Sequence, residues 1–307
     1  MTRRGLDNPA DVVVIDRLSK HYGATRALDE ATFTMRRGQL LGFLGPNGAG
    51  KSTAIRLLMG LLKPTAGRSL VFGLDPWRQV KEIHARVGYL SGDVRLYRDL
   101  TGRQTVRTIL HARRLSNCAE AERLAESLRL DLRTRVRHYS TGMKQKLGIV
   151  LALMHRPELL ILDEPTAALD PLMQQVVYRE LRAAAREGRS VLFSSHSLAE
   201  VESLCEHVVI LRSGRVVAAT SMESLKRRAG RQVSVRLPPT AKMAPDRPTE
   251  FVQEDFRNGL LRGRWTGPAS ALLNWLAALS PEEVVIQPPN LEDVFLNFYQ
   301  SPADVVE

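Results

Sequence analysis

A glycine-rich octapeptide between an apolar run and a helical pattern constrains the fold of this chain more than any other feature. Residues 45–52 read Gly-Pro-Asn-Gly-Ala-Gly-Lys-Ser, and the mostly apolar residues 39–44 precede them. Residues 51–62 then place apolar side chains on one face of a predicted helix, which Pro64 ends. Glycines in such a loop let backbone N–H groups converge on phosphate oxygens at a helix N-terminus. The order of strand, loop and helix therefore predicts a nucleotide-binding α/β protein.

The loop also supplies predicted ligands for the phosphates and for a metal ion. Lys51 would reach the β and γ phosphates, and the hydroxyl of Ser52 would hold Mg²⁺. A coincidental glycine turn is the alternative interpretation. The residues expected to surround the phosphates are Gly45, Pro46, Asn47, Gly48, Ala49, Gly50, Lys51, Ser52 and Thr53.

Further strand-like segments alternate with helical sequence, which is typical of a mostly parallel sheet covered on both faces. Residues 12–15 and 31–35 predict a β-rich opening, and residues 207–219 predict a hairpin. Between residues 101 and 137 the apolar spacing is helical, which predicts a helical insertion. The other strand-like segments are residues 86–90, 159–162 and 190–194.

Two domains are predicted within the 307 residues. Residues 11–222 would form an α/β nucleotide-binding domain with a mostly parallel sheet, an antiparallel β subdomain and a helical subdomain at about residues 93–155. After Leu225 the composition of the sequence changes and prolines become frequent. Residues 223–307 are therefore predicted to form a small α+β accessory domain.

Two carboxylates follow the apolar run at residues 159–162. Asp163 and Glu164 would lie at the carboxyl end of a buried strand, where α/β sheets bind ligands. Asp163 would contact Mg²⁺ through water, and Glu164 would polarise a water for attack on the γ-phosphate. A solvated strand end is the alternative.

Several further segments resemble motifs of the ATP-binding cassette (ABC) ATPases. Residues 139–146, Tyr-Ser-Thr-Gly-Met-Lys-Gln-Lys, resemble the signature sequence and stand just before the Asp-Glu strand, where that family has it. Residues 164–170 resemble the D-loop, and residues 194–196 resemble the end of the strand that carries the switch histidine. Tyr22 occupies the place of the aromatic residue that stacks on adenine. The resemblance covers residues 12–220 and implies the P-loop ABC ATPase fold, with ATP and Mg²⁺ as cofactors.

The resemblance also implies that two cassettes act head to tail, as a homodimer or as a heterodimer with a related ATPase. The signature of one subunit, with Ser140 and Gly142 at the start of a helix, would cap the ATP held by the other subunit. Asp170 would contact the partner across the dimer. Together with Pro171, it also predicts the start of a helix.

The catalytic residues implied by the resemblance are Glu164, His196 and Lys51. His196 would reach the γ-phosphate and help to hold Glu164 and the attacking water. A histidine at a strand end is otherwise commonly an ordinary surface residue. Ser197 followed by Glu200 predicts a capping box that starts the next helix.

One position departs from the family pattern. Where the family has a glutamine that ligates Mg²⁺ and senses the membrane partner, this chain has Gly92, followed by Asp93. We expect Asp93 to substitute as a metal ligand, because carboxylate oxygens suit Mg²⁺. The alternative is that the contact is missing and residues 91–93 form a simple turn. The complete set of expected metal ligands is Ser52, Asp163 and Asp93.

The net charge of +11 is concentrated in the predicted helical insertion. Residues 93–137 contain eleven arginines and six acidic residues, so nearly half of the net charge lies there. The resemblance implies that this subdomain faces a membrane subunit near the anionic inner leaflet, where each basic residue contributes about 1 kcal/mol. A solvated arginine-rich face is the alternative.

No apolar stretch approaches the roughly 20 residues of a membrane helix, so the resemblance implies a separate polytopic membrane permease subunit. Residues 289–295 resemble the tail of the exporter group that includes daunorubicin-resistance ATPases. The sequence thus predicts an ATP-hydrolysing subunit that powers export of a drug, antibiotic or lipid-like substrate. It would be cytoplasmic and peripheral on the inner face of the cell membrane. The alternatives are an importer ATPase and a soluble ABC ATPase acting on nucleic acid or ribosomes, although no nucleic acid partner is expected.

Overall fold

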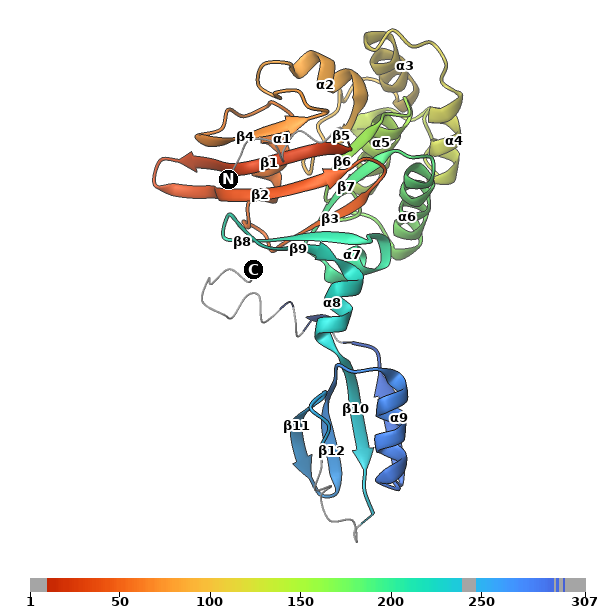
Figure 1. Cartoon of the computed structure of the whole chain (residues 1–307). Helices are drawn as coiled ribbons and strands as arrows, with labels where there is room; N and C mark the ends of the chain where they lie inside the picture. The colour runs from red at the N-terminus through yellow and green to blue at the C-terminus, as the bar shows by residue number, and fades with distance from the viewer. Residues whose placement is uncertain (1–9, 239–246, 290, 293–294, 296–307) are drawn as a thin grey trace. The chain divides into compact units, whose positions relative to one another are not determined.

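Residues up to Ala219 form one unit of the chain and residues from Thr220 form a second, in a computed structural model (Figure 1). The structure describes residues 10–238, 247–289, 291–292 and 295. The boundary predicted from the sequence stands three residues later, between residues 222 and 223. The apolar spacing of residues 291–298 predicts a C-terminal helix, most of which lies outside the described residues.

A six-stranded sheet forms the centre of the first unit. Its strands are β3 (Leu40–Leu44), β5 (Val87–Leu90), β6 (Leu159–Asp163), β7 (Ser190–Ser195), β8 (His207–Arg212) and β9 (Arg215–Ser221). Their order is β5-β6-β7-β3-β8-β9, and the pairs from β5 through β8 are parallel. Every residue of β3, β6 and β7 is buried. This explains why these strands appear in the sequence as mostly apolar runs rather than as alternating patterns. The predicted parallel sheet is confirmed.

A second, antiparallel sheet packs against the first one. Its strands, in the order β2-β1-β4, are β1 (Asp11–Tyr22), β2 (Thr25–Arg36) and β4 (Ala66–Val71). One core contains Phe33 of β2, Phe43 of β3 and Ile55 of α1 (Lys51–Leu58). The ring centroids of Phe33 and Phe43 lie 5.5 Å apart. Burial of each such side chain stabilises the fold by about 2 kcal/mol. The core therefore holds β3 and α1 in place, and with them the glycine loop that connects the two.

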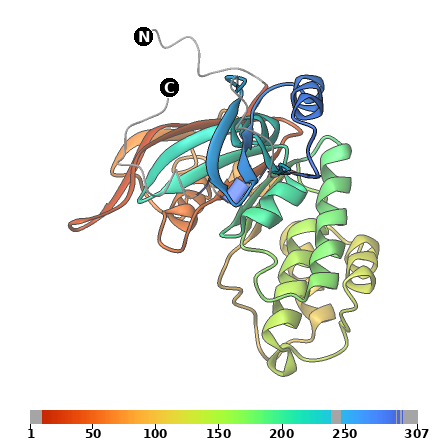
Figure 2. The ribbon, with the colours of Figure 1, turned by 90° about the horizontal axis from the view of Figure 1, so that it is seen from below.

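Three helices gather at one side of the first unit, away from the β1–β2 hairpin (Figure 2). They are α3 (Gly102–Ala112), α4 (Ala119–Ser127) and α5 (Thr141–Leu153). α3 and α4 lie within the helical insertion predicted between residues 101 and 137, and α5 follows it. The other helices described in this unit are α2 (Val80–Arg86), α6 (Pro171–Arg186) and α7 (Leu198–Leu204).

The helix after the glycine loop ends four residues earlier than predicted. α1 stops at Leu58 rather than at Leu62. Gly60 has φ 64°, and the N–H of Leu61 donates to the carbonyl of Arg56 over 2.9 Å. A Cβ at position 60 would lie 2.2 Å from the carbonyl oxygen of Pro76. A left-handed glycine therefore ends the helix, although apolar residues continue beyond it.

Two arginines tie the helical insertion to the rest of the first unit. Arg113 donates to the carbonyls of His84 and Val87 over 3.1 and 3.2 Å, and burial lowers the pKa of its guanidinium. Arg123 on α4 pairs with the buried Glu180 on α6 over 2.8 Å. Both guanidinium groups are therefore engaged by partners within the first unit, although half of the Arg123 side chain stays exposed.

The second unit contains a four-stranded antiparallel sheet in the order β11-β12-β10-β13. Its core joins strand residues such as Val233 and Trp265 to Leu272 and Leu276. The indole N–H of Trp265 donates to the carbonyl of Pro268 over 3.0 Å. The predicted small α+β domain is confirmed. The elements are α8 (Met222–Ala229), β10 (Arg231–Arg236), β11 (Phe251–Arg257), β12 (Leu260–Trp265), α9 (Ala269–Ala278) and β13 (Glu283–Gln287).

His155, after α5, makes the stability of the first unit depend on pH. Burial, with a smaller contribution from Arg113, lowers the pKa of His155 from 6.5 to about 4. The unfolded chain therefore binds a proton between these values and the folded chain does not, so stability falls as the pH falls below 6.5. We expect the free energy of unfolding to drop by about 2 kcal/mol more between pH 7 and pH 5 in the wild type than in His155→Leu. Urea unfolding at both pH values tests this, and equal drops would contradict it.

Candidate active site

The glycine loop is held by backbone contacts that exclude side chains at two glycines. Gly50 has φ 106°, and a Cβ there would lie 2.4 Å from the carbonyl oxygen of Ala27. A Cβ on Gly45 would lie 2.6 Å from the carbonyl oxygen of Leu211. α1 begins directly after the loop, and no side chain in the described structure caps it. Its first N–H groups can therefore bind an anion.

Lys51 lies at the centre of the loop and is 5% exposed. Its Nζ donates to the carbonyl of Gly45 over 2.6 Å and to that of Pro46 over 3.2 Å. It also lies 3.3 Å from Oε1 of Glu164, which follows β6. The sheet thus brings the predicted lysine and the predicted carboxylate into one ion pair across 113 residues of sequence.

Glu164 and His196 meet because β6 and β7 are parallel neighbours. Nδ1 of His196 lies 3.3 Å from Oε2 of Glu164, so Glu164 lies between the lysine and the histidine. Ser194 donates to Oδ1 of Asp163 over 2.7 Å and accepts from the N–H of Glu164 over 2.9 Å. The three predicted catalytic residues, Lys51, Glu164 and His196, therefore share one contact chain.

Two side chains hold the backbone of Glu164, which has φ 48°. Ser194 binds its N–H, and Nε2 of the buried Gln145 donates to its carbonyl over 3.2 Å. A left-handed conformation is uncommon for a glutamate and needs such support. The local sequence around Gln145 and Ser194 does not predict these roles. Each is a polar residue within an apolar element. A buried polar side chain needs a hydrogen-bond partner, and this requirement could have indicated a structural role.

The signature residues pack against the D-loop of the same chain. Ser140 caps α5 by accepting from the N–H of Met143 over 3.2 Å. A Cβ on Gly142 would lie 2.8 Å from the carbonyl oxygen of Ala168. Asp170 caps α6 by accepting from the N–H of Met173 over 3.0 Å, so the predicted helix start is confirmed. Ser140 and Gly142 thus contact their own helix and the D-loop rather than Lys51.

The remaining predicted residues lie at the edges of the site. Tyr22 ends β1 and is 47% exposed, with Nζ of Lys20 5.3 Å from its ring centroid. The carboxylate of Asp93 pairs with Arg95 over 2.7 Å and is 65% exposed. A Cβ on Gly92, in contrast, would lie 3.3 Å from Oδ2 of Asp163. The residue beside Asp163 is therefore Gly92. The geometry gives no support to Asp93 as a metal ligand, and that role stays a prediction.

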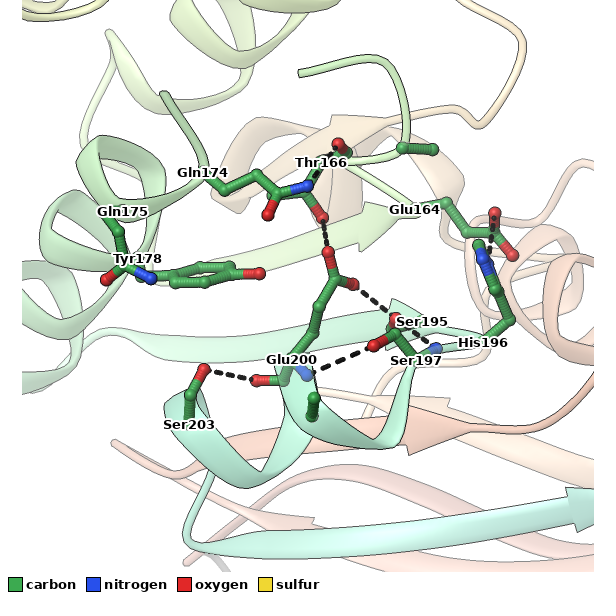
Figure 3. Close-up of a pocket in the computed structure, with 12 residues that line it drawn as sticks. Glu164, Thr166, Gln174, Gln175, Tyr178, Ser195, His196, Ser197, Glu200 and Ser203 are labelled. Carbon is green, nitrogen blue, oxygen red and sulfur yellow. Dashed lines mark hydrogen bonds and ion pairs between the residues drawn. The ribbon is translucent and has the colours of Figure 1, made fainter. Parts of the chain in front are cut away.

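A cavity of about 460 Å³ extends from Glu164 and His196 toward α6 and α7 (Figure 3). Glu200 projects into its centre and bonds to Thr166 and Ser195. The predicted capping box is only half correct. Ser197 does cap α7, accepting from the N–H of Glu200 over 3.4 Å. The N–H of Ser197 donates instead to Oγ of Ser195 over 2.9 Å, because the carboxylate of Glu200 is used elsewhere.

The chain resembles proteins of one family. Its sequence matches the family described as ABC transporter over residues 28–167. Daunorubicin resistance ATP-binding protein DrrA3 of Streptomyces coeruleorubidus is 34% identical over 93% of this chain and 95% of its own length. Nod factor export ATP-binding protein I of Rhizobium johnstonii is 32% identical over 91% and 92%. Bacitracin transport ATP-binding protein BcrA of Bacillus licheniformis is 37% identical over 72% and 73%.

Solved structures agree with these relatives. The ATP binding subunit of an ABC transporter is 34% identical, with a TM-score of 0.66 over 71% of this chain and 92% of that chain. A cassette described as dimeric and bound to ADP and Pi is 21% identical, with a TM-score of 0.63 over 68% and 98%, and is therefore similar in fold. The fold and the site thus define an ATP-binding cassette. The chain belongs to the ABC transporter family and is the ATPase subunit of such a transporter.

Gln145 provides a test of how Glu164 is supported. Gln145→Leu keeps the volume of a buried side chain but removes the donor to the carbonyl of Glu164. We expect kcat for ATP hydrolysis to fall about tenfold with unchanged affinity for ATP, because Gln145 holds the backbone of Glu164, the predicted catalytic residue, and does not contact the glycine loop. Gln175→Leu, at an exposed glutamine of α6, is the matched control. Loss of ATP affinity in parallel with kcat would contradict the prediction.

Proposed function

We propose that this chain is the ATP-hydrolysing subunit of an exporter, and that it powers transport of a drug, antibiotic or lipid-like substrate through a separate membrane subunit. The observation that carries the proposal is the contact chain from Lys51 through Glu164 to His196 beside the glycine loop. The names of the relatives, which concern daunorubicin resistance, Nod factor export and bacitracin transport, support the exporter class and the kind of substrate.

The glycine loop and Lys51 bind the phosphates of ATP in this proposal. The N–H groups at the start of α1, which no side chain in the described structure caps, and the ammonium of Lys51 supply donors and positive charge. Tyr22 stacks on the adenine from the end of β1. The position of Lys51 against Glu164 leaves the lysine balanced by a carboxylate, and the phosphates compete for it as a second anionic partner.

Mg²⁺ fits the oxygen donors at the same place. Ser52 in the first turn of α1 and Asp163 at the end of β6 are a hydroxyl and a carboxylate, the hard ligands that this ion prefers. Mg²⁺ there would neutralise charge on the phosphate oxygens. Ser194 holds one oxygen of Asp163 through its hydroxyl, which leaves Oδ2 on the side of Gly92.

Glu164 acts as the general base in this proposal and His196 orients it. The carboxylate of Glu164 is 25% exposed, so water can reach it. His196 is 53% exposed beside it and can turn to an additional phosphate oxygen while keeping its contact with Glu164.

Two copies of the chain, or one copy and a related ATPase, complete the sites. Ser140 and Gly142 start α5, a 13-residue helix with no acidic residue in its first turn, so its N-terminus can receive the γ-phosphate of a partner subunit. Asp170 stands beside them at the end of the D-loop and would contact the partner. The relative that is described as dimeric supports this assembly.

The transport partner is a polytopic membrane subunit, and the chain is peripheral on the cytoplasmic face of the membrane in this proposal. No helix in the described part of the chain is long and apolar enough to cross a bilayer. A cavity of about 440 Å³ beside Gly92, lined by Arg56, Tyr89 and Arg95 among others, offers a place for a segment of the membrane subunit. Tyr97 follows Leu96, which lines this cavity, and is 72% exposed.

Glu164→Gln tests the catalytic role. The amide keeps the volume of the carboxylate and cannot accept the proton of the attacking water, so we expect hydrolysis to fall by about 10² to 10⁴-fold. ATP binding should persist, and light scattering should show a dimer that ATP stabilises. Hydrolysis at the wild-type rate would refute the assignment of Glu164.

Tyr97→Asp tests the docking of the membrane subunit. A charge on this exposed aromatic should lower the amount of membrane subunit that co-purifies from detergent extracts by at least about fivefold, because desolvated aromatic contacts dominate such interfaces. The ATPase activity of the isolated chain should stay unchanged. Leu61→Asp, at another exposed apolar position, is the control. Equal recovery of the membrane subunit with Tyr97→Asp would contradict the location of the interface.

A further inference from the structure

One carboxylate joins the two loops that carry Glu164 and His196. Oε1 of Glu200 accepts from the hydroxyl of Thr166 over 2.8 Å, and Oε2 accepts from the hydroxyl of Ser195 over 2.5 Å. Figure 3 shows Glu200 reaching from α7 between these two hydroxyls, with Glu164 and His196 to one side. Both hydroxyl residues are 1% exposed, so their positions are set by the surrounding core.

Thr166 and Ser195 lie next to the two predicted catalytic residues in the sequence. Thr166 follows Glu164 by two residues, and Ser195 immediately precedes His196. Nothing in the local sequence links the ends of β6 and β7, and the parallel pairing of these strands reaches only Asp163 and Ser194. Beyond these pairs, the N–H of Glu164 donates to Ser194, and Glu200 adds a connection between the two loops through Thr166 and Ser195.

The loops are braced on the outer side as well. Nε2 of Gln174 donates to the carbonyl of Thr166 over 3.4 Å. Oγ of Ser195 also accepts from the N–H of Ser197, so this one hydroxyl is both donor and acceptor. Tyr178 lies against the same carboxylate, and burial together with the charge of Glu200 raises the pKa of its hydroxyl. The hydroxyls of Thr166, Ser195 and Tyr178 thus surround the carboxylate of Glu200.

We propose that Glu200 is a positioning residue, whose carboxylate holds the loop of Glu164 and the loop of His196 at the separation that hydrolysis needs. The inference rests on the roles proposed above for Glu164 and His196. Hydrogen bonds from hydroxyls to a carboxylate are about twice as strong as neutral ones. A contact 3.3 Å long between Glu164 and His196 can therefore be maintained through two such bonds.

The first experiment compares variants of the full chain in steady-state ATP hydrolysis. Glu200→Ala removes both acceptors, and we expect kcat to fall by about 10 to 100-fold, because a misplacement of the reacting groups by about 1 Å costs that much. KM for ATP should stay within about threefold, since the glycine loop is untouched. Glu200→Gln can accept from one hydroxyl and should lie between Glu200→Ala and the wild type.

Thr166→Val and Ser195→Ala guard against a variant that fails to fold. Each removes one of the two bonds and leaves Glu200 in place, so each should lower kcat with KM unchanged. Glu206→Gln, at the exposed glutamate that follows α7, is the matched control and should have wild-type kinetics. Wild-type kcat in Glu200→Ala, Thr166→Val and Ser195→Ala, all folded by circular dichroism, would overturn the proposal.

A second measurement separates positioning from general bracing. Single-turnover hydrolysis is measured for Glu200→Ala in the wild-type and in the His196→Ala background. If Glu200 acts through the relation of Glu164 to His196, its loss should cost less than about threefold once the imidazole is gone. An equal fold loss in both backgrounds would overturn the inference. Glu164→Gln, measured in parallel, distinguishes this outcome from failure of the proposed function, because that failure requires Glu164→Gln to remain active.

Discussion

The parallel pairing of β3, β7 and β6 is the constraint on which the active site depends. Parallel strands end at the same edge of a sheet, so the segments that follow them lie close together although they are far apart in sequence. Lys51 follows β3, His196 follows β7 and Glu164 follows β6. The ion pair at 3.3 Å between Lys51 and Glu164, and the contact at 3.3 Å between Glu164 and His196, are consequences of this order.

The sheet places these residues, and buried polar side chains then fix them. Ser194 joins Asp163 to the backbone of Glu164, Gln145 binds the carbonyl of Glu164, and Glu200 spans the next two loops. A buried polar group costs about 1 to 3 kcal/mol if it loses its partner, so each bond in this network resists displacement. The network also connects Gln145, which belongs to the helix that starts with the signature, to the backbone carbonyl of Glu164 in the same chain. The signature and Glu164 would therefore move together when a second subunit docks.

Much of the fold and of the site could be predicted because the signals are local. The glycine loop, the apolar run before Asp163 and the helix start at Asp170 each lie within a few residues, so their physical reasons can be seen in the sequence. The supporting residues could not be predicted in this way. Glu200 contacts Thr166, 34 residues earlier, and Gln145 contacts Glu164, 19 residues later. In the local sequence Glu200 has the spacing of a capping box, and only the tertiary structure reveals that its carboxylate is used elsewhere. The same limit applies at positions 92 and 93. The sequence favours Asp93 as the metal ligand, but only the tertiary structure shows that Gly92 is the residue that faces Asp163.

In the proposed function, Glu164 and His196 act on the γ-phosphate as one unit held by the sheet and its polar network. The most direct test is a double-mutant cycle on single-turnover ATP hydrolysis with Glu164→Gln, His196→Ala and the combined variant. Residues that act as a unit are strongly non-additive. We expect the combined variant to hydrolyse ATP about as slowly as the slower single variant. Losses that multiply, so that the combined variant is slower by the product of the two single effects, would contradict it.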